Sequence, residues 1–360
     1  MRQTGSRRAR WSSILFTFFV ALHGSLSLCA AEGIRAFDLE LRALVYDPFT
    51  ARIYATSPGG LLQIDPDSGR VLRTFQVGAN LSRVELGADR GLWIGLDDEG
   101  AVRRFNLQTL SAEEPIVVRA DAAILDISPS RFDPYYLAVA TMPAGSSTPV
   151  AALVRNGTVL PLTQTIRHLA LDVNFLLGQA NAGNIIRYSI DGFGIGGPVA
   201  AIGASARASM ELAEDALYTS DGGVWPAPFI ALDRRSLPNW PAQGTVTINR
   251  STKEILFLSS SGGQLYLNRY DSARRHTGNH AIPGLEPFDP TESTIAAWSS
   301  NQLAFHTTSN LYLVNLDEVF LPADLEPIRQ DLSVTNLNFS QPVEITLTIT
   351  NHGPGTALNV

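Results

Sequence analysis

Two residue types that carry much of the covalent chemistry of proteins are nearly missing from this chain. Among its 360 residues, Cys29 is the only cysteine and Lys253 the only lysine. Cys29 lies at the end of an apolar N-terminal run with the features of a cleaved signal, so the mature chain is expected to hold no thiol. Thiol catalysis, disulfides and cysteine-zinc sites are thereby excluded. Lys253 falls in an expected turn between two strands, an exposed position that does not favour Schiff-base chemistry.

The N-terminal segment is expected to be a secretion signal. The first ten positions hold four arginines and no acidic residue, an apolar run follows over residues 14–28, and Ala30-Ala31 precede Glu32. Such a run is short for a membrane span, and the small residues after it favour cleavage. We therefore predict a signal over residues 1–31. The mature protein would be secreted, periplasmic or held at the cell surface, with no integral membrane segment.

Basic residues are scarce in the expected mature chain. Removal of residues 1–31 leaves 23 basic and 34 acidic residues, a formal charge of −11. A field of this sign repels phosphate backbones and anionic lipids. The composition therefore argues against nucleic acid or a membrane surface as the partner.

Complete catalytic motifs are missing as well. The chain has no Gly-x-Ser-x-Gly sequence. His276 and His280 are four residues apart, but they bracket Thr-Gly-Asn in an expected loop and lack the glutamate of a zinc protease helix. His168 and His306 lie in expected strands that could face a central channel, although a single strand histidine is more often hydrogen-bonded within the fold. The glycine-rich segment 192–197 is followed by Pro198 and a strand, where a dinucleotide site needs a helix. No catalytic or metal-binding residue is predicted.

Two acidic turns leave calcium open as a ligand. Asp65-Pro-Asp-Ser-Gly69 and Asp97-Asp-Glu-Gly100 place carboxylates close together. A calcium site takes about six to eight oxygens, and the full loop pattern with its closing glutamate is missing. Aspartate and glycine are also the residues that β-turns prefer. We interpret both segments as structural turns and predict no cofactor, with bound calcium as the alternative.

The residues that are present repeat at about forty residues, the period of β-propeller blades. In residues 42–75 and 81–105, short runs of aliphatic, aromatic and β-branched residues are separated by Asp, Pro, Ser and Gly, the composition of strands and tight turns. The run expected to form the second strand of each unit returns at 136–140, 175–177, 216–219, 255–258 and 303–306. We predict an all-β fold, a seven-bladed β-propeller of four-stranded antiparallel blades over residues 32–320.

The two ends of this propeller are expected to meet in one blade. Residues 34–38 resemble the fourth strand of the first full unit, residues 72–76, whereas the last unit, residues 294–316, supplies only three strands. Adding residues 34–38 to that unit closes the ring and leaves no open sheet edge.

One segment carries a family resemblance. Leu62-Gln-Ile-Asp-Pro-Asp-Ser-Gly-Arg-Val-Leu72 combines a strand, an acidic turn and a second strand. On this segment the chain resembles the YVTN-type and quinoprotein-like seven-bladed propellers of bacteria. The resemblance implies a propeller over most of the mature chain, in a family whose members often act as surface or periplasmic interaction scaffolds and include some enzymes. A shared fold does not choose between these functions.

After residue 320 the composition changes. Residues 321–330 are predicted to be a linker, and residues 331–334 and 343–350 show the alternation of two further strands. Leu347-Thr-Ile-Thr-Asn-His-Gly-Pro-Gly355 resembles CARDB-like immunoglobulin-like repeats of bacterial surface proteins (domain of unknown function eleven type), in which an Asn-x-Gly-Pro turn follows a threonine-rich strand. Residues 331–360 are therefore expected to be the incomplete front part of such a β-sandwich, followed by further sequence.

Loops between the second and third strands of propeller blades open onto one rim of the central channel. Candidate binding residues in or beside these loops are Asp97, Asp98, Glu99, Met142, Asn181, Asp221, Trp225 and His306. Trp225 is the first choice, because an aromatic side chain in a stiff, proline-flanked loop presents contact area at low entropic cost. The alternative is that these loops are ordinary insertions and that Trp225 folds over a blade edge.

Two functions fit these features. The first is a secreted or cell-surface interaction scaffold, whose non-catalytic propeller binds a protein or glycan partner. The second is a propeller hydrolase, lyase or quinoprotein-like oxidoreductase with a metal or cofactor in the channel. Three or more inward-facing carboxylates, Asn or His at one end of the channel would favour the second function, and a channel of small apolar groups would favour the first.

Overall fold

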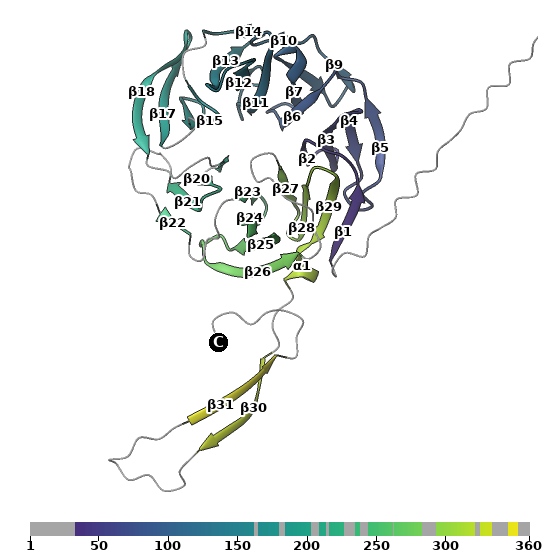
Figure 1. Ribbon diagram of the computed structural model, residues 1–360, viewed down its shortest axis with the longest axis vertical. Helices are drawn as coiled ribbons and strands as arrows, with labels where there is room; N and C mark the ends of the chain where they lie inside the picture. Colours follow the sequence, from purple (N-terminus) through teal and green to yellow (C-terminus); the bar gives the residue numbers. More distant parts are fainter. Residues whose placement is uncertain are drawn as a thin grey trace, which may run out of the picture.

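The fold is a ring of sheets around a central channel. The computed structural model describes residues 33–161, 165–179, 184–202, 209–213, 216–226, 235–237, 244–261, 263–282, 293–320, 325–332 and 345–351. Within them, seven antiparallel sheets stand around one axis like blades (Figure 1). The predicted all-β, seven-bladed propeller is thereby confirmed. The predicted signal, residues 1–31, lies outside the described residues.

The strands of each blade follow one another outward from the channel. Blade one comprises β2 (Ala43–Asp47), β3 (Arg52–Ser57), β4 (Gly60–Ile64) and β5 (Val71–Phe75). Blade two comprises β6 (Leu81–Leu86), β7 (Gly91–Leu96), the short 3-10 helix η1 (Asp97–Glu99), β8 (Ala101–Asn106) and the outer pieces β9 (Ser111–Ala112) and β10 (Ile116–Val117). Blade three comprises β11 (Ala122–Pro129), β12 (Tyr136–Pro143), β13 (Val150–Arg155) and β14 (Thr158–Val159).

The remaining blades repeat this order. Blade four comprises β15 (His168–Leu171), β16 (Phe175–Gln179), β17 (Ile185–Asp191) and β18 (Gly194–Ile202). Blade five comprises β19 (Met210–Leu212), β20 (Ala216–Thr219), β21 (Gly223–Pro226) and β22 (Arg235–Ser236). Blade six comprises β23 (Gly244–Asn249), β24 (Glu254–Ser261), β25 (Gln264–Tyr270) and β26 (His276–Ile282). The predicted second strands of blades three to six correspond to β12, β16, β20 and β24.

Blade seven joins the two ends of the propeller, as predicted. It comprises β27 (Ile295–Trp298), β28 (Gln302–His306), β29 (Asn310–Asn315) and, outermost, β1 (Ile34–Asp38), and the short helix α1 (Leu316–Val319) follows β29. β1 pairs antiparallel with β29, so that Ile34 lies opposite Val314 and Asp38 opposite Asn310. This pairing leaves no open edge between the first and last blades.

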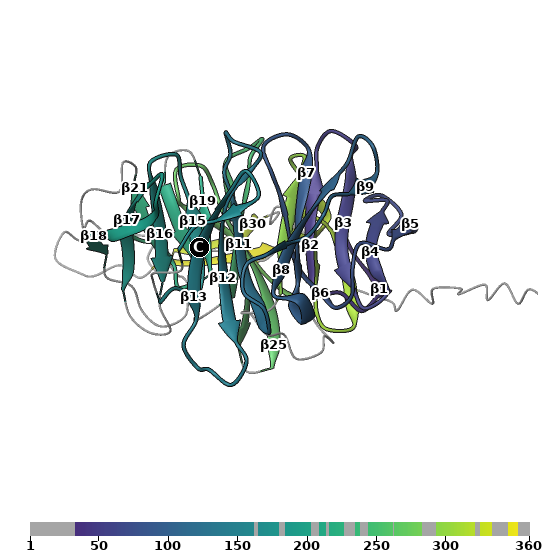
Figure 2. The same cartoon turned by 90° about the horizontal axis from the view of Figure 1, so that it is seen from above.

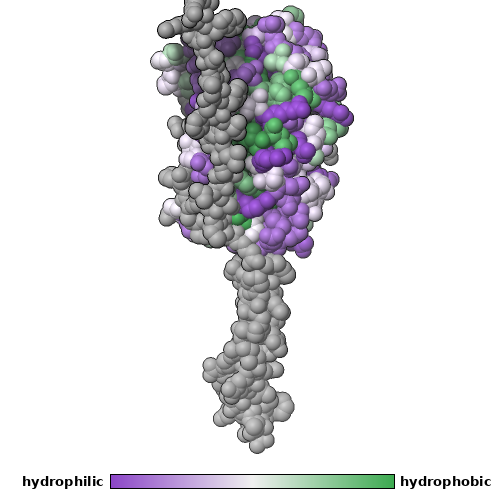
Figure 3. All heavy atoms as spheres, turned by 90° about the vertical axis from the view of Figure 1, so that its right-hand side faces the viewer, coloured by the Kyte–Doolittle hydropathy of each residue, from purple (hydrophilic) through white to green (hydrophobic). Residues whose placement is uncertain are grey.

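The core is divided among the junctions between blades. The described residues form seven clusters of buried apolar side chains, one between each pair of neighbouring blades. Side chains of a strand alternate between the two faces of its sheet, so each blade buries apolar groups on both sides. One outer side of the ring (Figure 3) shows hydrophilic residues interspersed with smaller hydrophobic groups. Burial at seven junctions thus stabilises the ring without disulfides.

Turn residues set where strands end. The buried Asp47 accepts hydrogen bonds from the backbone N–H of Thr50 (3.0 Å) and from its hydroxyl (2.6 Å) after β2. The Asp65–Gly69 segment forms the β4–β5 turn, in which Gly69 has φ 69° and donates to the Asp65 carbonyl (2.8 Å). The glycine-rich segment 192–197 lies in the β17–β18 hairpin. Both segments have the structural turn roles that the sequence indicated.

The ring has two different faces. Every blade has the same strand order, with its first strand at the channel, and these first strands all run in the same direction along the channel axis. The turns after the first and third strands of each blade therefore share one side, here named the first-turn face, which includes residues 48–51 of blade one. The turns after the second strands lie on the other side, the second-turn face, which includes η1. Figure 2 shows the ring edge-on, with the connection after β12 projecting from the second-turn face.

Beyond the propeller, two strands pair with one another. β30 (Leu325–Leu332) and β31 (Ile345–Asn351) form a two-stranded antiparallel sheet. β30 begins within the segment predicted as a linker, and β31 overlaps the predicted strand 343–350. The structure does not confirm an immunoglobulin-like sandwich, since the rest of residues 331–360 lies outside the described part. None of the helices in the described ranges is long and apolar enough to span a bilayer.

Candidate functional site

A pocket of about 360 Å³ occupies the central channel. Its walls are the first strands of the blades together with turns that follow them on the first-turn face. The polar residues that line it are Tyr46, Arg83, Glu85, Asp126, His168, Ser209, Glu211, Thr245, Thr247, Asn249, Arg250, Ser251, Ser293, Thr294 and Ser299. The channel is therefore polar and charged, and its lining includes the carboxyl groups of Glu85, Asp126 and Glu211. This differs from the small apolar lining expected of a non-catalytic scaffold and has the inward-facing carboxyl groups expected of a propeller enzyme.

Strand periodicity aims these side chains inward. In β6, Arg83 and Glu85 line the channel, while Val84 between them is buried in the cluster at the junction of blades one and two. Alternate residues of a strand point to opposite sides, so polar residues at every second position of a first strand reach the channel.

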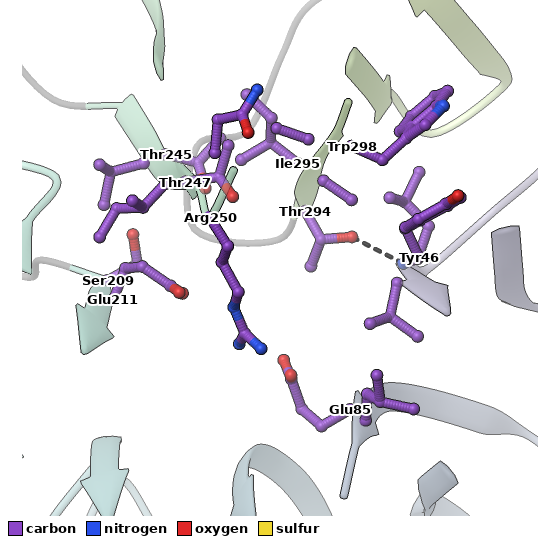
Figure 4. A pocket seen from close by; sticks show the side chains of 18 of the residues that line it. Tyr46, Glu85, Ser209, Glu211, Thr245, Thr247, Arg250, Thr294, Ile295 and Trp298 are labelled. Carbon is purple, nitrogen blue, oxygen red and sulfur yellow. Dashed lines mark hydrogen bonds between the residues drawn. The ribbon is translucent and has the colours of Figure 1, made fainter. Parts of the chain in front are cut away.

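Charged groups from four blades meet around the pocket. Glu85 belongs to blade two, Asp126 to blade three and Glu211 to blade five, and Arg250 directly follows the first strand of blade six. In Figure 4 the Arg250 side chain extends from the end of β23, with its guanidinium toward the Glu85 carboxyl and with Glu211 on another wall. One cation thus lies among carboxyl groups contributed by separate blades.

The channel changes the acidity of Glu85. Burial raises its pKa to about 8, and the negative charges of Glu211 and Asp126 act in the same direction, while Arg83 and Arg250 oppose them. The side chain keeps part of its surface open to the channel, yet the ring encloses it on all sides. Most Glu85 carboxyl groups are therefore protonated at neutral pH and donate a hydrogen bond.

Asp126 and Glu211 are shifted in the same direction. Burial raises the Asp126 pKa to about 6, against the opposing effects of Arg83 and of hydrogen bonds from the N–H groups of Leu169 (2.7 Å) and Ile127 (3.0 Å). Burial also raises the Glu211 pKa, and Arg250 opposes this shift. Asp126 remains mostly ionised at neutral pH, so the channel presents both a carboxyl donor and a carboxylate acceptor.

Hydroxyl groups and an aromatic pair form the wall made by blades six, seven and one. Thr245 and Thr247 of β23 and Thr294 before β27 face the pocket (Figure 4). The Thr294 hydroxyl accepts a hydrogen bond from the Leu44 N–H (2.7 Å). The Tyr46 and Trp298 rings stack with centroids 5.1 Å apart. This wall supplies neutral polar groups beside aromatic surface.

His306 is a structural residue at the junction of the last and first blades. It is buried, its Nε2 accepts a hydrogen bond from the Thr294 N–H (3.1 Å), and its Nδ1 donates to the Thr307 carbonyl (3.1 Å). Burial lowers the pKa of the ring to about 4. These contacts fix a neutral imidazole that does not line the pocket, which corrects the expectation of an accessible rim histidine.

Trp225 also lies inside the fold. It is in β21, its exposed fraction is 0%, and it packs between blades four and five with Leu177 and Leu217. The expectation that it presents an aromatic contact at the rim is therefore corrected. Alternation within β21 directs its large ring to the blade junction, where it buries more apolar surface than a loop position would allow.

The other described rim candidates lie on the second-turn face. Asp97 accepts a hydrogen bond from the Ile124 N–H (2.9 Å), Asp98 accepts one from the Asn80 amide (2.9 Å), and Asp221 accepts one from the Gly223 N–H (3.2 Å). Glu99 lies in η1 and Met142 near the end of β12. None of these residues lines the channel pocket, so a ligand role for them stays a prediction. Asn181 lies outside the described residues.

His168, which the sequence placed in a strand that could face the channel, lines the pocket. The charged channel residues were not predicted, because the rim loops were expected to carry the binding residues. Arg83 and Glu85 are separated by one residue in a first strand, and Asp126 occupies the same strand of the next blade. Polar residues at alternate positions of consecutive first strands are the signal that finds them. No group of three His, Cys, Asp or Glu side chains suited to a metal ion occurs among the residues described here.

Comparisons with known proteins agree on the fold. No family model and no curated protein matches the chain. A streptogramin B lyase structure is similar at 14% identity with a TM-score of 0.60, over 78% of this chain and 97% of that one. The β-propeller domain of Myceliophteria thermophila Cps50 (Swd1) is similar at 12% identity with a TM-score of 0.59, over 78% and 99%. The extracellular domain of the two component system protein BT3049 from B. thetaiotaomicron is similar at 11% identity with a TM-score of 0.56, over 86% and 44%. At these identities the likeness establishes the propeller fold alone.

Proposed function

We propose that this protein is an interaction scaffold whose propeller binds a neutral, hydroxyl-rich ligand of the sugar class in its central channel. The observation that carries the proposal is the meeting of Glu85, Asp126, Glu211 and Arg250, from four blades, around one pocket of about 360 Å³. A pocket of this size falls within the range of small-molecule sites, about 300–1,000 Å³.

The hydrogen-bonding groups suit a ligand with many hydroxyls. A sugar hydroxyl both donates and accepts, and the channel offers donors in Arg250 and protonated Glu85 and an acceptor in Asp126. The threonine hydroxyls of β23 serve in either role. Because Arg83 and Arg250 offset the ionised carboxylates, the site favours a neutral ligand over a strongly charged one.

The aromatic wall suits the ring of a sugar. A pyranose carries apolar C–H groups on its faces, and these pack favourably against aromatic side chains. Tyr46 lines the pocket and its orientation is set by stacking on Trp298. The proposal also includes export of the mature protein through the predicted signal over residues 1–31, and a surface repeat over residues 331–360 that spaces the propeller from an anchor.

Calorimetric titration of the full mature chain tests this function. Glucose, galactose, N-acetylglucosamine and disaccharides of each are the probes. At least one is expected to bind, and Glu211→Gln and Arg250→Gln are each expected to weaken it about tenfold or more, because each removes a charged hydrogen-bonding group from the channel. Glu114→Gln, at an exposed position between β9 and β10 on the outside of blade two, is the matched control and should bind as the unmodified chain does. The proposal is contradicted if no probe binds, or if both channel variants bind a probe as tightly as the unmodified chain does.

An acid–base enzyme is the second candidate, favoured by the three carboxyl groups that line the channel and by the acidity of two of them. Glu85 and Asp126 share the channel and have pKa values of about 8 and about 6, on either side of neutrality. Such a pair matches a general acid and a general base. One protein of similar fold is titled a streptogramin B lyase. Mass spectrometry of the bound ligand after incubation distinguishes the two functions: an unchanged ligand supports the scaffold, and conversion that Glu85→Gln abolishes supports the enzyme.

A further inference from the structure

Exposed apolar side chains gather on the first-turn face. Seven large hydrophobic side chains are strongly exposed among the described residues, and five of them lie in turns of this face: Phe49, Phe132, Tyr135, Val173 and Phe193. The other two belong to outer strands, so the second-turn face contributes none of the seven. The apolar contact area of the ring is therefore concentrated on one side.

The channel pocket reaches the same side. Pro48 and Arg250, which line it, both belong to turns of the first-turn face. Phe49 follows Pro48 directly and is 60% exposed. The Arg90 guanidinium, from the corresponding turn of blade two, lies 3.8 Å from the centre of the Phe49 ring. Phe49 and Arg90 thus form an aromatic platform between two turns at the edge of the pocket. One turn contains the pocket-lining Pro48, and the other follows the pocket-lining Leu86.

This platform is held in place by the fold. The buried Asp47 accepts hydrogen bonds from the N–H groups of Phe49 (3.2 Å) and Thr50 (3.0 Å), so the backbone that carries the ring is fixed. The Arg90 cation attracts one face of the ring, and the exposed fraction of Phe49 leaves apolar surface open to a ligand. The guanidinium also brings N–H donors to the edge of that surface.

We infer that Phe49 and Arg90 form a second sugar subsite just outside the channel, so that the ligand is an oligosaccharide that extends from the channel over the first-turn face. This inference rests on the proposed function. One sugar unit occupies the channel, and the next packs a C–H face on Phe49 while its hydroxyls accept from the guanidinium of Arg90.

The test compares the affinity for a monosaccharide with the affinity for its linear tetrasaccharide. Calorimetry measures the affinity of the full mature chain for the sugar that binds in the channel and for its linear tetrasaccharide. The tetrasaccharide should bind about tenfold more tightly, and Phe49→Ala should weaken it about three- to tenfold while the monosaccharide binds unchanged. Phe49→Trp should still bind the tetrasaccharide more tightly than the monosaccharide, since an aromatic ring remains at this position. Phe193→Ala removes a more exposed ring (86%, against 60% for Phe49) from the outer hairpin of blade four and should alter neither affinity.

The outcomes separate this inference from the proposed function. The subsite is overturned if the tetrasaccharide binds no more tightly than the monosaccharide, or if Phe49→Ala leaves the tetrasaccharide affinity unchanged. Neither result contradicts a sugar site in the channel. Equal losses in the Phe49→Ala and Phe193→Ala variants overturn it in favour of a broad contact with a macromolecular partner. Absence of any sugar binding removes the proposed function and this inference together.

Discussion

Glu85 illustrates how position in the ring changes the chemistry of one side chain. Its carboxyl group would be ionised at neutral pH on an open surface, where the ordinary pKa is 4.5. In the channel, loss of solvent and the neighbouring carboxylates raise the pKa to about 8, although two arginines act against the shift. The ring therefore converts a carboxylate acceptor into a carboxyl donor.

This shift predicts the pH dependence of stability at Glu85. Between pH 4.5 and about 8 the unfolded chain ionises this group while the folded protein keeps it protonated. Its stabilising contribution is therefore complete below pH 4.5 and is lost as the pH rises through about 8. Glu85→Gln should melt about 2 °C or more above the unmodified chain at pH 8.5, and the gap should narrow toward pH 4.5.

Scanning calorimetry across this pH range checks the prediction. Glu99→Gln, which removes a carboxyl group from η1 outside the channel, is the control and should not reproduce the pH-dependent gap. A melting difference between Glu85→Gln and the unmodified chain that is constant from pH 4.5 to 8.5 would show that the folded state does not hold a proton on Glu85.

At the scale of elements, side chains join the inner strands of neighbouring blades, the first strands and, in blade one, the second strand β3. The Thr56 hydroxyl donates to the Ser82 carbonyl (2.6 Å), Arg83 Nε donates to the Leu125 carbonyl (3.0 Å), and Asp126 accepts from the Leu169 N–H (2.7 Å). Arg83 and Asp126 also line the channel, so they have a structural as well as a chemical role. Glu211 and Arg250 are therefore better probes of ligand binding.

The junction of blades four and five depends on Trp225. Because this side chain is fully buried, Trp225→Ala should open a cavity and cost about 3–5 kcal/mol of unfolding free energy. Chemical denaturation measures this loss. Under conditions where the variant is folded, its affinity for the channel ligand should equal that of the unmodified chain. A small loss of stability together with loss of binding would instead support the ligand contact expected from sequence.

At the scale of the whole molecule, stability depends on closure of the ring. β1 comes from the start of the propeller, and β29 comes from its end. Asp38 and Asn310 lie directly opposite one another in this pair. Opposed residues of antiparallel strands have Cα atoms about 4.5–5.5 Å apart, within the range that a disulfide spans.

A covalent bond at this position should stabilise the ring. The double variant Asp38→Cys, Asn310→Cys, in a chain with Cys29→Ser, should form a disulfide. This bond should add about 2–4 kcal/mol to the free energy of unfolding, because it lowers the conformational entropy of the unfolded chain. The melting temperature of the oxidised protein should exceed that of the same protein after reduction. Asp38→Cys alone is the control and should not respond to reductant. Failure of the pair to oxidise in the folded protein would contradict the β1–β29 pairing.

Much of the fold was predictable from local patterns. Turn chemistry at Asp47 and Asp65–Gly69 marked strand ends, and the recurring second-strand run located the blades. The similarity of residues 34–38 to a fourth strand indicated ring closure, which the β1–β29 register confirms. These features depend on residues close together in sequence or on a regular period, so they are visible before folding.

The candidate site was not predictable in the same way. His306 and Trp225 carried side chains typical of binding sites, yet hydrogen bonding and apolar burial place both inside the fold. Glu85 and Glu211 resembled ordinary strand carboxylates, yet they line one pocket. Burial of a side chain and its enclosure in a common pocket decide these roles, and neither can be predicted from the residues next to it in sequence.

The amino-acid sequence alone determined the all-β class, the seven repeats, the strand order and the joining of both ends in one blade, because periodicity and turn chemistry act locally. Only the tertiary structure decided that polar residues of the first strands form the site. Curvature of the ring brings blades two, three, five and six around one channel, and the low solvent content there shifts the acidity of their carboxyl groups.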